Sequence, residues 1–532
     1  MQAAAAFAIL AFFAANGLVA ARTHTPTVDE FIYVPSGYWH LRTGDFALDP
    51  TNPPLMKMAA AAPLLAMDVR VDGDPRWRTQ GSGWEPWVFG TRFMETNRAR
   101  YLDLFFAARL VVLAFGVGTG VLVLARGRAL VGPAAALAAL FVYGTMPPLV
   151  AHASLATLDM GVTAFLFAAF VALERAARTR SPAWAAATGV LGGLAFTAKG
   201  VAALFLPLFP VLAALAWREW TARGAVRLAA GMTIAGIGAW LAVLVAYGFD
   251  GFPVPAPVLD GIRFQTQASA TGEFPAFLNG AWSQTGWWHY YLVTLAYKLP
   301  VPTLALLAAG IASLVMRPMR LADAAWLVGP PLLLLYVLSA HYGKNYGVRY
   351  LLPALPFLCL LAGRGAAVIS SHGRGGAAIA TLLLAWQLAG TALAAPHHLA
   401  WFNELAGGPD GARRILLDSN LDWGQDLGRV KTYLDARGLD RICLGYFGHV
   451  DPGLYGIEYD FPPVRPAPGL CAVSANFLAG YPYGITYAGP RILGVGPGAW
   501  SWLDGRRPVA RIGRSIFVFE TSEADARSLA AR

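Results

Sequence analysis

Two adjacent carboxylates, Asp29 and Glu30, follow the first apolar segment of the chain. They lie in residues 27–57, TVDEFIYVPSGYWHLRTGDFALDPTNPPLMK, which also carry Tyr33 and a Pro-Pro pair at 53–54. Carboxylates beside a membrane are costly to place and usually have a function. We therefore interpret this stretch as the floor of a catalytic site in which Asp29 is the general base. The alternative is a solvated loop whose charges face water.

Other ionisable side chains interrupt or end apolar segments. Such residues are functional candidates by default, although snorkelling or a structural ion pair explains any single one equally well. The candidates for substrate or donor binding, together with Tyr33, are Arg109, His152, Asp159, Lys199, Lys298, Lys344 and Arg349. Lysine and arginine suit a phosphate headgroup, because fixed cations stabilise the anion both when it is bound and when it leaves. With a carboxylate that deprotonates an acceptor hydroxyl, the set fits group transfer from a lipid phosphate.

The elements that position these residues are expected to be membrane helices. The chain has 532 residues, of which 56% are hydrophobic and only 14% are charged. Its mean hydropathy of +0.49 is not that of an ordinary soluble domain. The net charge of +10 does not indicate a nucleic-acid partner, because the arginines cluster in short loops between apolar spans. No GxxxxGK[ST], dinucleotide or HExxH motif stands out, which argues against ATP-driven transport within this chain.

About eleven segments are long enough to cross a bilayer, at roughly 17 to 25 residues each. They lie near 2–20, 103–125, 131–150, 155–173, 184–200, 201–217, 228–248, 290–315, 323–340, 350–363 and 375–395. The first lacks the basic start and the cleavage site of a signal peptide, so we expect it to remain as a helix. We therefore predict a mainly α, polytopic membrane bundle over residues 1–395.

The arginines of the short loops predict the orientation of this bundle. They occur in alternate loops, as the positive-inside rule asks of cytoplasmic ones. This parity places the N-terminus in the cytoplasm and the long segments 21–102, 249–289 and 396–532 outside. All large polar segments then lie on one side of the membrane. This asymmetry favours an enzyme that acts outside the cytoplasm over a symmetric alternating-access transporter.

Two of these outer segments have structure of their own. Residues 28–41 and 54–67 have helical character, and we expect short helices along the membrane interface. The second outer loop ends in the aromatic run 286–291, GWWHYY. Anchoring in the membrane interface is the ordinary explanation of such a run. Lining of a lipid or sugar site is the alternative.

The character of the chain changes near residue 396. Strand-like runs at 441–447, 470–477 and 515–519 and a helix at 424–437 predict a small α/β extracytoplasmic domain over 396–532. Cys443 and Cys471 lie in this tail, so they could form one disulfide if the tail lies in an oxidising compartment. Cys359 lies in an apolar span, where we expect it to be inert.

The tail also contains the acidic segment DSNLDWGQD, residues 418–426. Asp418, Asn420, Asp422 and Asp426 match positions 1, 3, 5 and 9 of a calcium loop. Trp423 and Arg429 replace the glycine and the glutamate that this loop requires. We favour a turn and helix cap, with a sugar contact through Trp423 as a further alternative. A requirement for a divalent metal stays open.

Several of these segments together resemble the family 39 glycosyltransferases, which include the protein O-mannosyltransferases and are similar to the aminoarabinose transferases of lipid A. They are DEFIYVPSGYWHLRTGDFALDPTNPPLMK at 29–57, HASLATLD at 152–159, TAKG at 197–200, GWWHYYLVTLAYKLPVP at 286–302 and RYLLPALP at 349–356. The blocks AWFNELAGGPDG at 400–411 and DSNLDWGQDL at 418–427 look like the tail of a bacterial subgroup. The MIR domain of the eukaryotic enzymes does not occur, which weakens the case for a protein acceptor.

The resemblance implies a C-type glycosyltransferase fold in a bacterial cytoplasmic (inner) membrane, with an outer-face cavity and a polyprenyl-phosphate sugar donor used with inversion. It makes Asp29 the base and lets Glu30 hold substrate or position the loop. Arg109 and Asp159 match family positions. Lys199, Lys344 and Arg349 correspond, more loosely, to basic donor-phosphate contacts.

The leading hypothesis is a membrane glycosyltransferase that moves a sugar from this donor to an acceptor hydroxyl on the outer face. Its partners would be the lipid-linked donor, membrane lipid and a glycan, lipid or protein acceptor. The alternatives are a lipid-linked glycan transporter or flippase and a non-catalytic scaffold for envelope assembly. The sequence does not name the sugar, the acceptor or the oligomeric state.

Overall fold

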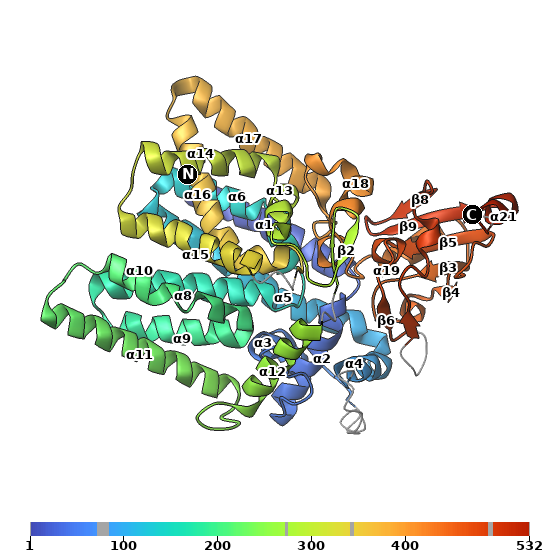
Figure 1. Ribbon diagram of the computed structural model, residues 1–532, viewed down its shortest axis with the longest axis horizontal. Helices are drawn as coiled ribbons and strands as arrows, with labels where there is room; N and C mark the ends of the chain where they lie inside the picture. Colours follow the sequence, from blue (N-terminus) through green and yellow to red (C-terminus); the bar gives the residue numbers. More distant parts are fainter. Residues whose placement is uncertain (1, 72–84, 272–274, 341–344, 488–492, 531–532) are drawn as a thin grey trace.

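The computed structural model describes residues 2–71, 85–271, 275–340, 345–487 and 493–530. Helices fill most of the molecule, and a small sheet lies at its C-terminal end (Figure 1). The predicted helical membrane bundle with a sheet-containing tail is therefore confirmed.

Seven helices in the described ranges are long and apolar enough to cross a membrane, or nine if two bent pairs each form one span. The seven are α1 (Gln2–Thr23), α5 (Tyr101–Leu130) with a preceding 3-10 turn, α8 (Asp159–Thr179), α11 (Ala222–Ala246), α15 (Leu321–Ala340), α16 (Leu355–Ser370) with the 3-10 helix η5 (Val348–Ala354), and α17 (Gly373–Ala394). The bent pairs are α6 (Pro133–Gly144) with α7 (Pro147–Ala153), at 62°, and α13 (Tyr290–Lys298) with α14 (Val301–Met316), at 115°.

Each of the eleven predicted segments is helical, but four of them are not single long helices. The bent pairs break at prolines, whose ring and missing N–H end a helix. The fifth and sixth segments are α9 (Pro182–Ala198) and, after the 3-10 helix η4 (Gly200–Phe205), α10 (Leu208–Ala216). They are separated by Lys199, whose backbone is extended, with φ −159° and ψ 130°. This break places a lysine between two helices, and the lysine belongs to the candidate site described below.

The long segment after α1 folds into short helices at one end of the bundle. They are α2 (Val28–Thr43), α3 (Leu55–Ala61), the 3-10 helix η1 (Ala62–Ala66) and α4 (Glu85–Thr96), and α12 (Ala256–Thr271) joins them from the second long loop. The predicted helices at 28–41 and 54–67 are present as α2, α3 and η1. A capping box starts α2, because Glu30 accepts a hydrogen bond from the Thr27 backbone N–H.

The tail forms a five-stranded sheet in the order β4-β3-β5-β9-β8. Its strands are β3 (Arg441–Gly445), β4 (Glu458–Asp460), β5 (Gly469–Ser474), β8 (Ala510–Ile512) and β9 (Ile516–Thr521), and helix α19 (Leu427–Asp435) precedes them. β3 is parallel to β4 and β5, whereas β9 is antiparallel to β5 and β8. Cys443 and Cys471 are register partners on β3 and β5 and form a disulfide. Cys359 is free and buried.

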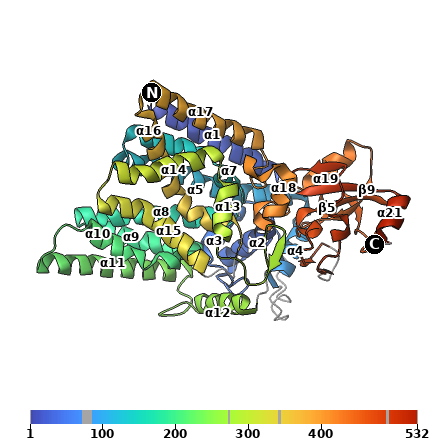
Figure 2. The ribbon, with the colours of Figure 1, turned by 45° about the horizontal axis from the view of Figure 1, so that its top comes forward.

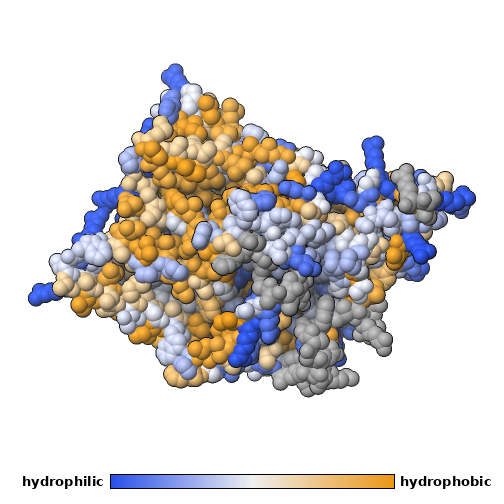
Figure 3. All heavy atoms as spheres, in the orientation of Figure 1, coloured by the Kyte–Doolittle hydropathy of each residue, from blue (hydrophilic) through white to orange (hydrophobic). Residues whose placement is uncertain are grey.

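The two ends of the bundle differ in charge. The α10–α11 and α14–α15 connections lie at the end away from the tail sheet (Figures 1 and 2). Arginines gather there in ion pairs: Arg126 with Glu174, Arg178 with Asp323, and Arg180 with Glu219. Apolar side chains cover the helices between the two ends, and polar side chains gather over the tail (Figure 3). This separation of arginines and tail agrees with the predicted alternation of arginine-rich and arginine-poor loops. The side of the membrane on which the tail lies stays a prediction.

Helices α9 and α11 pack closely because α9 presents glycines to the backbone of α11. A Cβ at Gly189 would lie 1.9 Å from the Ala235 carbonyl oxygen, and one at Gly193 would lie 2.4 Å from that of Ala239. Small residues are the usual means of close approach between membrane helices. Gly192, on the same helix, has no neighbour within 4 Å of its Cβ position.

Replacing Gly189 with Ala should therefore separate α9 from α11 and destabilise the bundle by about 1–3 kcal/mol, the usual cost of overpacking. Thermal unfolding of the purified protein in detergent measures the change. Gly192→Ala is the matched control and should leave the melting temperature unchanged. Equal melting temperatures for the two variants would contradict the close packing.

Candidate active site

Asp29 and Arg349 form an ion pair that joins α2 to η5 across 320 positions of the sequence. The Arg349 Nη1 donates to Asp29 Oδ2 at 2.6 Å. The side chains are 12% exposed for Arg349 and 18% exposed for Asp29, so the pair is screened from bulk water and still open to a ligand. Two of the predicted site residues therefore meet.

A second ion pair lies beside the first. Lys199 Nζ donates to Asp159 Oδ1 at 2.6 Å, between the α9–η4 break and the first residue of α8. The Tyr350 ring connects the two pairs, because Lys199 Nζ lies 4.1 Å and Arg349 Cζ lies 5.7 Å from its centroid. Two cations of the candidate set thus lie near one aromatic ring, and each of them is paired with a carboxylate.

Tyr33 closes this cluster from α2. Its electrostatic neighbours include Asp29, Asp159 and Arg349. Burial raises the pKa of Tyr33 well above its usual value, and the Asp29 carboxylate adds to the rise. The phenol therefore stays neutral. The Asn52 side chain donates to its oxygen at 3.1 Å.

Sequence reasoning missed the buried pair of Asp49 and Lys57 in the same opening segment. Lys57 Nζ donates to the Asp49 carboxylate at 3.1 Å and to the carbonyls of Asp49 and Asn52 at 2.7 and 2.8 Å. These bonds hold the turn that carries Asn52, the partner of Tyr33. The signal in the sequence that could have revealed this pair is an acidic residue and a lysine on either side of the Pro-Pro pair.

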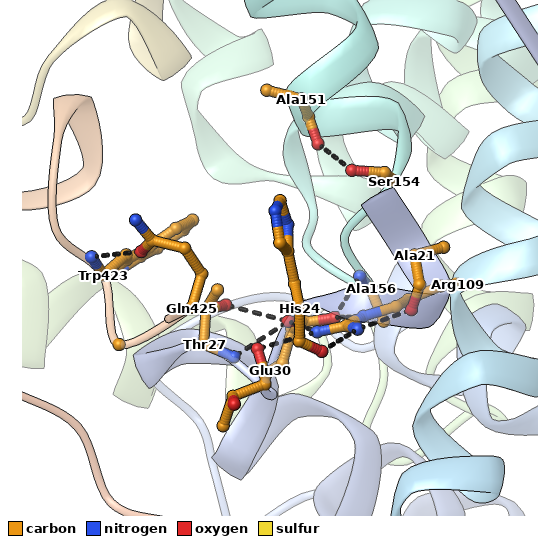
Figure 4. A network of polar contacts seen from close by, with 12 residues as sticks. Ala21, His24, Thr27, Glu30, Arg109, Ala151, Ser154, Ala156, Trp423 and Gln425 are labelled. Carbon is orange, nitrogen blue, oxygen red and sulfur yellow. Dashed lines mark hydrogen bonds and ion pairs between the residues drawn. The ribbon is translucent and has the colours of Figure 1, made fainter. Parts of the chain in front are cut away.

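Glu30 lies in a saturated network with Arg109 (Figure 4). Arg109 donates to both Glu30 carboxylate oxygens at 2.7 Å. The Ala156 backbone N–H adds a further bond to Glu30 at 2.7 Å. Arg109 also donates to the carbonyls of Ala21, His24 and Thr25, so all five of its N–H groups are used.

This network ties three segments together: the end of α1, the start of α2 and the loop between α7 and α8. Glu30 is 0% and Arg109 is 2% exposed. A carboxylate and a guanidinium with every group bonded inside the protein have little capacity left for a ligand. The geometry favours a positioning function for both residues.

His152, from α7, is fully buried. Within the described ranges neither of its ring nitrogens has a hydrogen-bond partner. Its ring lies 6.3 Å from that of Trp423 in an edge-on arrangement. Unlike Arg109, it keeps its hydrogen-bonding groups free.

Lys298 has a different environment from Arg349 and Lys199. Its Nζ donates to the carbonyls of Leu399, Trp401 and Asn420 at 2.9, 2.5 and 2.8 Å, and the residue is 1% exposed. These bonds hold the beginning of the tail against α13. Lys344 lies outside the described residues.

The tail itself reaches the site, which sequence reasoning did not predict. Asn420 Oδ1 accepts from the Val348 N–H at 3.0 Å, next to Arg349, and Asn420 Nδ2 donates to the Tyr290 hydroxyl at 3.2 Å. The Ser419 hydroxyl donates to the Tyr346 carbonyl at 3.0 Å. The motif DSNLDWGQDL was visible in the sequence, but its distance from the other motifs hid this proximity.

Trp423 completes the contact between tail and site. The Arg349 Cζ lies 4.6 Å from its ring centroid, in a cation–π arrangement. Its carbonyl accepts from the Val28 N–H at 3.1 Å, one residue before Asp29. The indole thus covers the cation of the Asp29–Arg349 pair, and its backbone holds the first turn of α2.

The remaining acids of this segment have separate partners. Asp426 accepts from the Ser515 hydroxyl at 2.9 Å and from the Arg514 N–H at 3.1 Å. Burial raises the pKa of Asp422 to about 8. The Asp422 Oδ1 accepts from the Gly424 N–H at 3.3 Å. These contacts within the segment and with the tail are those that the turn interpretation expects.

Replacing Arg109 with Met should leave Glu30 charged, buried and unpaired, which costs about 3–5 kcal/mol. Thermal unfolding in detergent and the yield of monodisperse protein measure this loss. Arg22→Met is the control, because Arg22 forms an exposed pair with Asp103, with side chains 59% and 58% exposed. If Arg109→Met melts like Arg22→Met and loses only ligand binding, the positioning function is wrong.

Comparison with known proteins places this geometry in context. The family model described as dolichyl-phosphate-mannose-protein mannosyltransferase matches residues 102–245. No curated protein sequence matches the chain. The crystal structure of ArnT from Cupriavidus metallidurans bound to undecaprenyl phosphate is similar over 98% of this chain and 98% of that chain, with a TM-score of 0.51 and 14% identity.

Two further structures are similar at lower TM-scores. ArnT from the same organism in the apo state gives 0.47 at 14% identity over 98% of both chains. The oligosaccharyltransferase of Archaeoglobus fulgidus, tethered with an acceptor peptide, gives 0.41 at 11% identity over 86% of this chain and 60% of that chain. The resemblance predicted from the motifs is thus confirmed by a mannosyltransferase family model over residues 102–245, and the predicted fold by an ArnT structure over nearly the whole chain.

Proposed function

We propose that this protein is a membrane glycosyltransferase that moves a sugar from a polyprenyl-phosphate donor to an acceptor hydroxyl. The observation that carries this proposal is the pairing of Asp29 with Arg349 beside the pair of Lys199 with Asp159. A carboxylate to take a proton and cations to hold a phosphate then lie at one site. The mannosyltransferase family model and the ArnT structure with its undecaprenyl phosphate support the same reaction class.

The proposed reaction is a single displacement. Asp29 takes the proton of the acceptor hydroxyl while the hydroxyl oxygen forms a bond to the anomeric carbon. The bond between that carbon and the phosphate oxygen breaks, and the electron pair leaves with the polyprenyl phosphate. Attack from the face opposite the phosphate inverts the anomeric configuration.

Arg349 has two tasks in this scheme. Without donor it pairs with Asp29 at 2.6 Å, which keeps the carboxylate in place. An incoming phosphate competes for the guanidinium, because phosphate oxygens accept from the same donors. As Arg349 turns to the phosphate, Asp29 is released to the acceptor. Lys199, paired with Asp159, supplies a second cation for the leaving group.

The other candidates support this centre. Glu30 and Arg109 position the first turn of α2 through their buried network. Tyr33 supplies a neutral phenol beside Asp29, and His152 keeps free ring nitrogens near Trp423. Lys298 holds the tail in place through backbone carbonyls.

We further propose that the site faces the outside of a bacterial cytoplasmic membrane. The arginine-rich connections lie at the opposite end of the bundle (Figure 1). The disulfide of Cys443 and Cys471 fits an oxidising compartment on the side of the tail.

Replacing Asp29 with Asn should lower transfer by about 10²–10⁴-fold, the usual contribution of a general base. Purified protein is incubated with a panel of polyprenyl-phosphate sugars, and mass spectrometry identifies the released lipid and the glycosylated product. Asp103→Asn, at an exposed ion pair, is the matched control and should stay active.

A fully active Asp29→Asn variant would contradict the assignment of Asp29 as the general base. Movement of the intact donor across vesicles without free polyprenyl phosphate would instead favour the transporter or flippase. A protein that neither cleaves nor moves the donor would fit the scaffold.

A further inference from the structure

The tail residue Asp418 lies against the candidate site because its neighbours are anchored there. Ser419 and Asn420 bond to the backbone of Tyr346 and Val348, on the N-terminal side of Arg349. Trp423 packs on the Arg349 guanidinium itself. The segment from 418 to 423 therefore wraps around Arg349, and Asp418 stands at its beginning.

The backbone holds Asp418 in an uncommon conformation. Its φ is 55°, in the left-handed region that non-glycine residues rarely adopt. The Asn476 side chain accepts from its N–H at 3.0 Å, and its carbonyl accepts from Leu421 and Asp422 at 2.8 and 3.0 Å. Such conformations persist where the surroundings over-determine them, and they cluster at functional sites.

Asp418 lies within electrostatic range of the charges of the site. Its electrostatic neighbours are Arg349 and Asp29. The side chain is half-buried, and in the described part of the chain it does not share the direct ion pair that Asp29 makes with Arg349. The Ser419 backbone N–H bonds to the Asp418 carboxylate, and a carboxylate with about four acceptor sites keeps capacity for a ligand.

Three tyrosines lie within electrostatic range of this second carboxylate. Asp418 is an electrostatic neighbour of Tyr346, Tyr481 and Tyr483. Tyrosine combines an apolar ring face with a polar hydroxyl, so it can pack on the apolar face of a sugar ring and bond to its rim. A carboxylate accepts hydrogen bonds from two adjacent hydroxyls. The surface offers the contacts that a polyhydroxylated ring requires.

We propose that the segment 418–423 forms the acceptor subsite and that the Asp418 carboxylate binds hydroxyl groups of a carbohydrate acceptor. This inference rests on the glycosyl transfer proposed above. Asp29 takes the proton of the hydroxyl that reacts, and Asp418 accepts a hydrogen bond from a neighbouring hydroxyl of the same sugar ring. A serine or threonine acceptor has a single hydroxyl and leaves the second carboxylate unmatched.

The charge state of Asp418 supports a pH dependence. Burial raises its pKa to about 6, while Arg349 opposes the rise and Asp29 adds to it. Its titratable and charged electrostatic neighbours are Arg349, Asp29, Tyr290, Tyr346, Tyr481 and Tyr483. The carboxylate is present above pH 6 and is lost as the pH falls through that value. Acceptor binding should weaken over the same range.

The test compares two reactions of the full-length protein. Release of polyprenyl phosphate without acceptor reports donor hydrolysis, and transfer to octyl glycosides reports acceptor use, with 1-octanol as the single-hydroxyl probe. Asp418→Asn should raise the KM for octyl glycosides about 10- to 100-fold, the loss expected for a hydrogen bond to a charged group. Donor hydrolysis and the KM for donor should change much less than the KM for octyl glycosides.

Two further readouts separate this effect from misfolding and from loss of catalysis. Asparagine tolerates the left-handed region, so Asp418→Asn should keep the wild-type melting temperature. Its acceptor KM should no longer rise below pH 6. The control is Asp435→Asn, at an exposed acid of α19, which should behave as wild type.

Three results would overturn the acceptor subsite. They are an unchanged acceptor KM in Asp418→Asn, a parallel loss of donor hydrolysis and transfer, and equal use of octanol and octyl glycosides by the wild-type protein. Failure of the proposed function looks different, because the wild-type protein then releases no polyprenyl phosphate with or without acceptor.

Discussion

The buried pair of Arg109 with Glu30 is the interaction on which the site depends. Its bonds reach the end of α1, the start of α2 and Ala156 in the loop before α8. Successive residues of an α-helix point about 100° apart, as 3.6 residues per turn require. With Glu30 committed to the interior, Asp29 must turn toward η5 and Arg349. Two adjacent carboxylates therefore have different partners: Glu30 pairs with Arg109, and Asp29 pairs with Arg349.

Arg349 stands at the centre of the remaining electrostatics. It meets Asp29 directly, shares the Tyr350 ring with Lys199 and lies under Trp423. A guanidinium in a poorly solvated site interacts strongly with an anion, since little water screens it. The balance between cations and carboxylates makes such a site stable without ligand and receptive to a phosphate. Replacing the Asp29 carboxylate by a phosphate as the partner of Arg349 costs less free energy than burying a phosphate at an apolar surface without a cation.

The tail is built into the membrane part through polar contacts of its first segment. Lys298 binds three tail carbonyls, and Asn420 bonds to Val348 and Tyr290. Buried polar groups of this kind are satisfied only when both parts are in place. The sheet beyond this segment packs around the disulfide of Cys443 and Cys471. The division at residue 396 therefore separates regions of different composition, whereas the contacts of Asn420 and Trp423 join them at the site.

Local patterns in the sequence determined the class of protein, the place of every long helix, the three main strands of the tail and the acidic pair at the start of α2. Hydropathy, proline positions and strand-like runs act over a few residues, so they can be read without the fold. The tertiary structure alone decided which charges meet. It paired Asp29 with a residue 320 positions away, directed Lys298 to backbone carbonyls and brought Trp423 of the tail onto Arg349. Ion pairing depends on distance in space and on burial, and neither is a property of local sequence.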